Sequence, residues 1–246
     1  VKEKRVLGSQ RALQFGGYPI EKVNARIYNC CVSFCDRLRF FQEAFWLLLC
    51  GSGVGFSVQK HHVGALPVFS HSAAERQTLE KKKYLIPDSI EGWADALGVL
   101  LSSYFATPVF PEYAGCRVVF DYSDVRPAGS KLNSSSGKAP GPEPLRRSLE
   151  QVRKLLDRCL ADGQTSLRPI DAYDVIMHAS DAVLSGGVRR SATICIFSPD
   201  DPEMMNAKVG NWFYDNPQRA RSNNSVMLIR DKTTREQFAE IMKSVQ

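Results

Sequence analysis

Apolar residues recur at helical spacing in four long segments of the chain. Because positions three and four apart share one face of a helix, this spacing predicts amphipathic helices that pack on a core. The predicted helices cover residues 39–50, 88–105, 145–161 and 171–184. The first ends at Gly51, which suits a left-handed C-cap. The second begins at Asp88 as its N-cap, with Glu91 in the capping-box position.

Shorter apolar runs between these helices have the composition of β-strands. They cover residues 25–34, 53–60, 117–121 and 192–197. Strands that alternate with helices are typical of an α/β fold with parallel pairing. Residues 71–83 are polar and charged, so we expect a surface insertion there. Residues 126–144 are rich in Ser, Gly and Pro and form a loop too long for a simple connection, which favours a functional role.

The composition is that of a globular protein, with 43% hydrophobic and 24% charged residues, and excludes a disordered or collagen-like chain. No apolar run reaches the length of about 18 residues that a membrane helix needs. The odd count of seven cysteines in a chain of this size indicates a reducing, cytoplasmic compartment. A net charge of +6 suits nucleic acid or nucleotide phosphates, and it suits a solvated surface equally well.

Both ends of the sequence indicate a piece of a longer polypeptide. The chain begins at Val1 rather than Met and has no signal peptide, and the helical pattern of residues 234–246 is cut at the last residue. We therefore expect the activity of the whole protein to depend on residues beyond this chain.

The cysteines and histidines do not predict a metal site. The cysteines nearest to one another lack C-x-x-C spacing; they are Cys30, Cys31 and Cys35. Adjacent residues on a strand point to opposite faces, which would separate His61 from His62. His178 lies on an apolar helical segment and is expected to be a core histidine.

Two glycine-rich motifs resemble phosphate-binding loops but fail in context. The Gly-Ser-Gly-Val-Gly run at 51–55 follows a helix and precedes a strand, whereas a dinucleotide fingerprint follows a strand and opens a helix. A tight helix-to-strand turn is the better interpretation. Gly137-Lys138 is followed by Ala139, where a P-loop requires Ser or Thr, so it is not a Walker motif.

Two further features are candidates for chemistry. Residues 185–192 join two glycines to Arg189 and Arg190, which suits either a nucleotide contact or a glycine C-cap followed by surface arginines. Cys30 shares one strand face with Tyr28 and Val32. It could act as a redox or radical thiol inside a barrel, or serve as a small packing residue.

The order of several motifs resembles the monomeric, adenosylcobalamin-dependent (class II) ribonucleotide reductases. The resemblance runs from about Ser9 to about Lys243, over segments 13–21, 25–30, 47–66, 88–94, 137–145, 185–190 and 211–226. It implies an α/β fold that forms roughly the first half of a ten-stranded α/β barrel, with a helical insertion. Residues 1–62 would start the barrel, residues 63–113 would be an insertion that builds an effector site by imitating a dimer interface, and residues 114–246 would continue the barrel.

The resemblance also implies reduction of ribonucleotides, generally triphosphates in such monomeric members, to deoxyribonucleotides by a thiyl-radical mechanism for DNA synthesis. Cys30 would be one cysteine of the redox pair that reduces the substrate. Asn29, Gly187 and Arg189 would bind substrate, with 185–191 as the second specificity loop. The first specificity loop would be 126–138, whose effector-binding residues would be Arg126, Ser130 and Lys138. Cys31 would be a packing residue only, since small neutral residues suit its position equally well.

Cofactors and partners follow from the same resemblance. They would be adenosylcobalamin, whose site is not assigned to this chain, an external dithiol such as thioredoxin, a ribonucleotide substrate and a deoxynucleotide allosteric effector. The complete protein would be a cytoplasmic monomer without membrane or direct nucleic-acid contacts, and its radical cysteine would lie beyond residue 246, leaving this chain inactive alone. A non-catalytic nucleotide-binding or regulatory module is the alternative. A nucleic-acid-binding domain lacks helix-turn-helix and zinc-finger signals.

Overall fold

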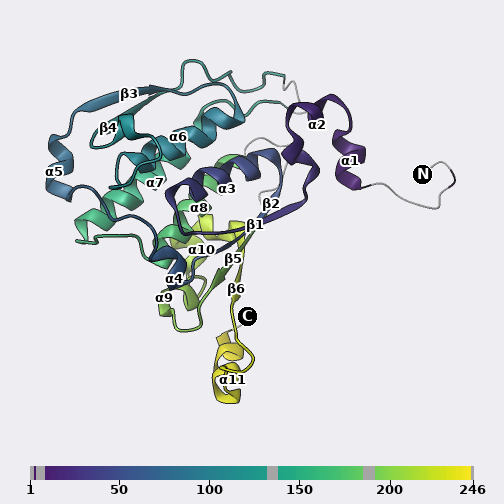
Figure 1. Cartoon of the computed structure of the whole chain (residues 1–246), viewed down its shortest axis with the longest axis vertical. Coiled ribbons are helices and arrows are strands. Elements are labelled where there is room, and N and C mark those ends of the chain that lie inside the picture. Colours follow the sequence, from purple (N-terminus) through teal and green to yellow (C-terminus); the bar gives the residue numbers. More distant parts are fainter. Residues whose placement is uncertain (1–2, 4–8, 132–137, 185–191, 245–246) are drawn as a thin grey trace.

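The computed structural model describes residues 3, 9–131, 138–184 and 192–244. Its central feature is a sheet of four strands in the order β1-β2-β5-β6 (Figure 1). The strands are β1 (Cys30–Phe34), β2 (Gly53–Ser57), β5 (Thr193–Phe197) and β6 (Ser222–Val226). Every pair within this sheet is parallel, as the alternation of strands and helices predicts.

Four long helices pack together on one side of this sheet and extend its core outward. They are α3 (Leu38–Cys50), α6 (Ile90–Ser102), α7 (Glu143–Ala161) and α8 (Pro169–Leu184). Helix α3 packs on α6 and α8, and α7 packs on both α6 and α8. The buried apolar residues of these helices join Val54, Phe56 and Cys195 of the sheet in one continuous core.

A second, two-stranded sheet lies on the outer side of α6. Its strands β3 (Lys81–Leu85) and β4 (Arg117–Asp121) are also parallel, because α6 forms the crossover between them. Val118 of β4 packs with Val99 of α6 in a small separate cluster. Helix α5 (Ala73–Thr78) precedes β3 and begins with a complete capping box between Ser72 and Glu75.

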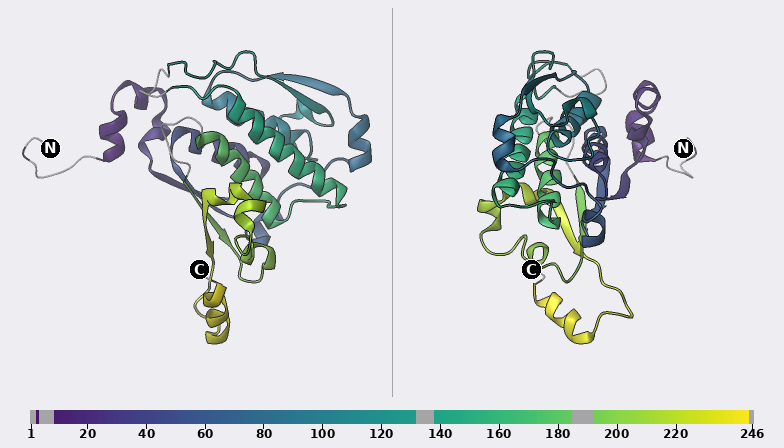
Figure 2. Two further views of the ribbon diagram at one scale, coloured as in Figure 1. Left: turned by 180° about the vertical axis from the view of Figure 1, so that it is seen from behind. Right: turned by 60° about the vertical axis from the view of Figure 1, so that its left-hand side comes forward.

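The remaining elements are short or lie at the ends of the chain. They are α1 (Gln10–Phe15), α2 (Tyr18–Lys22), η1 (Asn24–Ile27), α4 (Lys60–Val63), η2 (Pro111–Tyr113), α9 (Pro202–Met205), α10 (Trp212–Asp215), η3 (Pro217–Arg221) and α11 (Arg235–Ser244). Helix α11 extends away from the rest of the chain in both views of Figure 2.

Most predicted elements are confirmed, with boundaries shifted by a few residues. The four long helices and the strands at 53–57, 117–121 and 193–197 are present, and Gly51 adopts the left-handed conformation at the C-cap of α3, with φ of 86°. The run at 51–55 is therefore the predicted helix-to-strand turn. Loop 126–138 also lies between β4 and α7 as expected, although residues 132–137 are outside the described residues.

Three local predictions are wrong. The N-cap of α6 is Ser89, whose Oγ accepts from Gly92 N at 2.9 Å, because Asp88 instead pairs with Arg126. The predicted strand 25–34 begins only at Cys30, since Asn24–Ile27 form the turn η1. His61 and His62 belong to the short helix α4 rather than a strand, and their rings lie together with centroids 3.9 Å apart. The polar segment 71–83, predicted as a surface insertion, is mostly exposed and contains α5 and the start of β3.

No helix among the described residues is both long and apolar enough to cross a membrane. The same residues contain no disulfide and no cluster of three or more histidine, cysteine or acidic side chains that could hold a metal ion.

Candidate functional site

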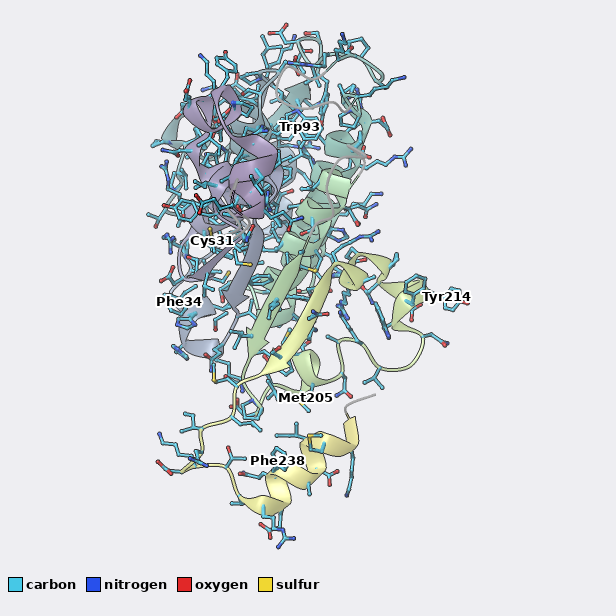
Figure 3. The ribbon with its side chains drawn as sticks, turned by 90° about the vertical axis from the view of Figure 1, so that its right-hand side faces the viewer. Cys31, Phe34, Trp93, Met205, Tyr214 and Phe238 are labelled. Atoms are coloured by element: carbon cyan, nitrogen blue, oxygen red, sulfur yellow. The ribbon has the colours of Figure 1, made fainter. Side chains whose placement is uncertain are left out.

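The face of the main sheet opposite α3 and α8 carries the candidate site. Strand register brings ten residues of four strands onto this face; they are Cys30, Val32, Phe34, Gly53, Gly55, Ser57, Ile194, Ile196, Asn223 and Ser225. Val32 is 74% exposed, and Phe34 and Ile194 are also exposed. Figure 3 shows Phe34 on the edge strand β1. An exposed apolar face of this kind marks a surface that contacts another group.

Cys30 is the first residue of β1 and is exposed on this face. It is paired in register with Gly53 of the neighbouring strand. A Cβ atom at Gly53 would lie 3.6 Å from Cys30 Sγ. Glycine at this position therefore leaves the thiol open from the side of β2.

Glycines 53 and 55 make the floor beside Cys30 unusually flat. They face the same side of β2, because residues two apart on a strand share a face. A Cβ at Gly55 would approach Val32 Cγ2 to 3.2 Å, closer than ordinary van der Waals contact. The two glycines therefore leave a strip of bare backbone on β2, between β1 and β5, here called the trough, against which a ligand could lie.

The segment before Cys30 is fixed by several hydrogen bonds. Gly53 N donates to Asn29 O at 2.7 Å, and Ser52 Oγ donates to Tyr28 O at 3.0 Å. Arg11 Nε donates to Asn29 Oδ1 at 2.9 Å, and the same guanidinium donates to Gly51 O. Arg11 thus joins the N-terminal helix α1 to the turn between α3 and β2, and it orients the Asn29 amide.

The other cysteines of the sheet region lie on the opposite side. Cys31 is half-buried, because adjacent residues of β1 alternate between faces. Cys35 and Cys195 are fully buried, and burial raises the pKa of both thiols well above the usual value. A protonated, inaccessible thiol is a poor nucleophile, so Cys30 is the thiol of this group best placed to react on the open face.

The described parts of loop 126–138 form a short hairpin. Ala139 N donates to Ser130 O at 2.8 Å, and Lys131 and Lys138 form an isolated antiparallel bridge. Arg126 Nε contacts Asp88 Oδ2 at 2.5 Å, and its Nη1 donates to Lys131 O at 3.2 Å. Ser130 Oγ donates to Pro127 O, and Lys138 is exposed. Arg126 therefore ties the loop to the start of α6.

Gly187 and Arg189 lie outside the described residues, which resume at Ala192. Ala192 O accepts a hydrogen bond from Val54 N at 3.0 Å. A Cβ at Gly53 would meet Ala192 O, Asn29 O and Cys30 Sγ, each at 3.6 Å. Gly53 is therefore surrounded by Asn29, Cys30 and Ala192. The first two are predicted site residues, and Ala192 directly follows the predicted second specificity loop, 185–191. The role of Gly53 and Gly55 beside Cys30 is not among the predictions from the sequence, although two glycines spaced by two on a predicted strand are a usable signal.

Comparisons with known proteins give a consistent picture of this chain. A family model described as "B12-dependent ribonucleotide reductase, insertion domain" matches residues 59–156. A putative adenosylcobalamin-dependent ribonucleoside-triphosphate reductase of Mycobacterium phage D29 is 37% identical over 228 residues, which cover 80% of this chain and 32% of that protein. The chain belongs to the B12-dependent ribonucleotide reductase family.

Other relatives within the reductase family match parts of the same region. The adenosylcobalamin-dependent ribonucleoside-triphosphate reductase of Lactobacillus leichmannii is 30% identical over 193 residues, covering 68% of this chain and 25% of that protein. A probable reductase of the same name from Dictyostelium discoideum is 34% identical over 147 residues, covering 58% of this chain and 18% of that protein. The chain thus spans about a third or less of the length of these reductases.

The fold agrees with this membership. The crystal structure of a B12-dependent (class II) ribonucleotide reductase superposes with a TM-score of 0.71 at 23% identity, over 87% of this chain and 35% of that one. The predicted fold class, part of the α/β barrel of these reductases, is confirmed. The match of the insertion-domain model reaches from α4 to α7 and includes both strands of the small sheet.

Proposed function

We propose that the protein containing this chain reduces ribonucleotides, as triphosphates, to deoxyribonucleotides by thiyl-radical chemistry that depends on adenosylcobalamin. The names of the curated relatives support the substrate class and the cofactor. The product would supply DNA synthesis. Because the chain covers at most a third of these relatives, it would contribute one part of the catalytic barrel and be inactive alone.

The exposed thiol of Cys30 on the open face of the sheet is the observation that carries this proposal. In the proposed reaction, Cys30 and a second thiol of the longer protein supply the two electrons that reduce the 2′ carbon of the ribose. The 2′ hydroxyl leaves as water, a C–H bond replaces the C–O bond, and the two thiols become a disulfide. An external dithiol such as thioredoxin would then reduce that disulfide by thiol exchange.

The trough beside Cys30 suits this role. A sugar that lies against the backbone of Gly53 and Gly55 would bring its carbon atoms close to the thiol, since no side chain separates them. Asn29, Gly187 and Arg189 are proposed to bind the substrate. Asn29 is exposed at the same end of β1 and its amide is held by Arg11, which favours a fixed orientation toward a ligand.

Arg126, Ser130 and Lys138 are proposed to bind a deoxynucleotide effector. The hairpin of loop 126–138 supports this assignment, because it holds a cationic segment beside the start of α6. Arg126 is already paired with Asp88, so an effector phosphate would have to share or replace that carboxylate. Residues 63–113 are proposed to build this effector site within one chain, which would make the complete reductase a monomer. The cytoplasm is its proposed location, which the odd count of seven cysteines favours.

No cobalamin site is assigned to the described residues. The groove beside β4, lined among others by Lys83, Asp121 and Arg146, has a volume of about 500 Å³ and charged walls, which do not fit a broad, largely apolar corrinoid. When bound by the longer protein, the cofactor would supply the radical that starts the reaction. No role toward it is assigned to a residue of this chain.

The experiment that tests the proposal compares Cys30→Ser with Cys31→Ser in a polypeptide extended to the length of the relatives. Multiple-turnover reduction of a ribonucleoside triphosphate, with a dithiol as reductant, is the measurement. Cys30→Ser should abolish turnover, because the substrate-reducing disulfide cannot form. Cys31→Ser should retain it, since Cys31 faces away from the open side of β1.

Near-normal turnover by Cys30→Ser would show that Cys30 takes no part in the reaction. If the extended wild-type protein shows no reduction but binds nucleotides, a non-catalytic regulatory module becomes the better description.

A further inference from the structure

Two histidines lie together at the end of the main sheet that the proposed reaction does not use. Cys30 is the first residue of β1, whereas Phe34 and Ser57 are the last residues of β1 and β2. Four residues of extended strand separate the two ends, a distance of about 13 Å. His61 and His62 belong to α4, which follows β2 after two residues, so they lie beside the carboxyl ends of the strands. Parallel α/β sheets commonly bind ligands at this edge.

The rings of Phe34, His62 and His61 form a row. The centroids of Phe34 and His62 are 4.5 Å apart, and those of His62 and His61 are 3.9 Å apart. His62 is half-buried in the middle of the row, and His61 is exposed at its open end. Contact with Phe34 therefore restricts the orientation of the His62 ring. Two imidazoles this close to one another can share one metal ion at the usual metal–nitrogen distance of about 2.0–2.1 Å.

Hydrogen-bond accounting at Ser57 decides which nitrogen of His62 carries a hydrogen. A serine hydroxyl has one hydrogen to donate and two lone pairs that accept. Ser57 Oγ donates to Gln59 Oε1 and accepts from Gln59 N, each at 3.3 Å. Its contact with His62 Nδ1 at 2.9 Å uses the second lone pair, so Nδ1 is the donor. In the neutral ring, the other nitrogen, Nε2, then has a lone pair that a ligand can take.

Metal-binding histidines have the same arrangement. The ring nitrogen that does not bind the metal usually donates to a neighbouring oxygen, which fixes both the ring and its tautomer. Ser57 is buried and provides this acceptor for His62. Burial and the neighbouring His61 lower the pKa of His62, so its ring is neutral near pH 7. The neutral imidazole is the form that binds a metal.

The charged groups near the two histidines do not oppose a cation. Lys60 of α4 is paired with Asp200, whose Oδ2 lies 2.8 Å from the Lys60 ammonium. Arg37 Nη1 lies 2.7 Å from Asp36 Oδ1. The negative charge of Asp36 acts on His62 and favours positive charge there. A divalent ion at His62 would therefore meet cations that are already paired and a carboxylate that attracts it.

From this geometry we propose that His61 and His62 bind one divalent transition-metal ion, through His62 Nε2 and one ring nitrogen of His61. Water completes the coordination, since the described residues contain no cluster of three or more protein ligands. Imidazole nitrogen suits nickel, copper and zinc ions. The ion holds α4 against the ends of β1 and β2. This site goes beyond the proposed function, because it lies at the opposite end of the sheet from Cys30 and involves no nucleotide.

The test is isothermal titration of the chain with nickel chloride at neutral pH. We expect saturable binding with a dissociation constant below about 100 μM. His61→Gln and His62→Gln should each weaken binding by at least about tenfold, because each removes one of the two protein ligands. Ser57→Ala should weaken it by about tenfold, because it removes the acceptor that orients the His62 ring.

The matched control is His71→Gln. His71 Nδ1 also contacts a serine hydroxyl, that of Ser70 at 2.8 Å, but its described contacts include no second histidine. Its loss should leave nickel binding within about twofold of the wild type. Thermal melts without metal show whether each variant is folded. Added nickel should raise the Tm of the wild type and leave that of the double variant His61→Gln/His62→Gln unchanged.

A measurement without metal checks the tautomer separately. Long-range proton–nitrogen NMR of the metal-free chain should find the hydrogen of neutral His62 on Nδ1. A hydrogen on Nε2 would show that the lone pair is not available, and it would contradict the proposed ligand atom.

Three results of the titration would overturn the proposal. One is the absence of saturable binding at about 1 mM nickel. The second is an unchanged affinity in both His61→Gln and His62→Gln. In the third, Cys30→Ser abolishes nickel binding whereas His62→Gln does not, which would assign the ion to the exposed thiol.

Discussion

Thiols only a few residues apart on this chain differ sharply in accessibility. Cys30 is exposed and Cys31 half-buried, whereas Cys35, five residues after Cys30, is fully buried. Cys30 and Cys31 differ because adjacent residues of β1 point to opposite faces of the sheet. Cys35 is buried because α3 packs over it beneath the sheet. Reactivity on this chain is therefore decided residue by residue rather than by the number of cysteines.

Alkylation of the folded chain should follow this order. With iodoacetamide at mildly alkaline pH, Cys30 should be modified first, and Cys35 and Cys195 only after unfolding, because burial both covers these thiols and raises their pKa. Mass spectrometry of peptides taken over time measures the order. Modification of Cys35 as fast as Cys30 would contradict the packing described for α3 and β1.

Asp174 and Arg219 form the best-buried ion pair described in the structure. Arg219 Nε and Nη2 donate to the two carboxylate oxygens at 2.9 and 2.7 Å, and Asp174 is 3% exposed. Asp174→Ala leaves the guanidinium without its partner, so we expect a loss of about 3–5 kcal/mol in the free energy of unfolding. Urea denaturation measures it. Asp181→Ala, which removes the exposed partner of Arg221, should cost no more than about 1 kcal/mol.

At the scale of elements, the sequence predicts the long helices better than the polar strands. The helices at 38–50 and 143–161 each bury an apolar stripe, which is visible in the order of residues. Strand β3 contains three consecutive lysines and becomes a strand only because it pairs with β4, a contact that local sequence does not encode. Strand β6, Ser-Asn-Asn-Ser-Val, is likewise set by its neighbours, since Tyr173 OH hydrogen-bonds to Ser222 and Asn224.

The candidate site was predictable to a similar extent. The motif order indicated Cys30 and Asn29, and the strand period indicated which face Cys30 would occupy. The contacts that hold them, from Arg11 and Gly53, join segments far apart in the sequence and follow from the tertiary fold. The choice of Ser89 over Asp88 as N-cap also depends on a distant residue, because Arg126 engages the Asp88 carboxylate.

The N-cap of α6 provides a test at this scale. Ser89→Ala removes the acceptor for Gly92 N and should lower the free energy of unfolding by about 1 kcal/mol, whereas Ser89→Asn should retain most of the stability. Denaturant titration of the two variants is the measurement. An alanine variant as stable as the wild type would show that this cap contributes nothing.

At the scale of the whole molecule, the half-buried His178 links stability to pH. Burial lowers the pKa of His178 below its ordinary value of 6.5, an effect that Asp174 and Asp181 partly oppose. The unfolded chain therefore binds more protons than the folded chain as pH falls below about 6.5. The contribution of His178 to stability is complete above that pH and is lost as the pH falls toward the pKa of His178 in the folded chain.

We expect the free energy of unfolding of the wild type to decrease between about pH 6.5 and pH 5. His178→Asn should show a smaller decrease over the same interval, because it removes one of the titrating groups. Urea titrations at a series of pH values compare the two slopes. Parallel pH profiles would mean that His178 has the same pKa in both states.

The order of strands in the main sheet also has a consequence for how the chain assembles. Strand β2 pairs with β5, yet the small sheet and the whole of helices α6, α7 and α8 lie between them in the sequence. For strands so far apart in the sequence, the entropy cost of closing the loop comes before any stabilising contact between the two strands can form. During synthesis, β1, α3 and β2 are complete long before β5 is made, so one edge of β2 stays unpaired in the meantime. Rapid local folding of the intervening helices would bring β5 to this edge sooner. The segment between β2 and β5 would then affect the rate of folding as well as the final structure.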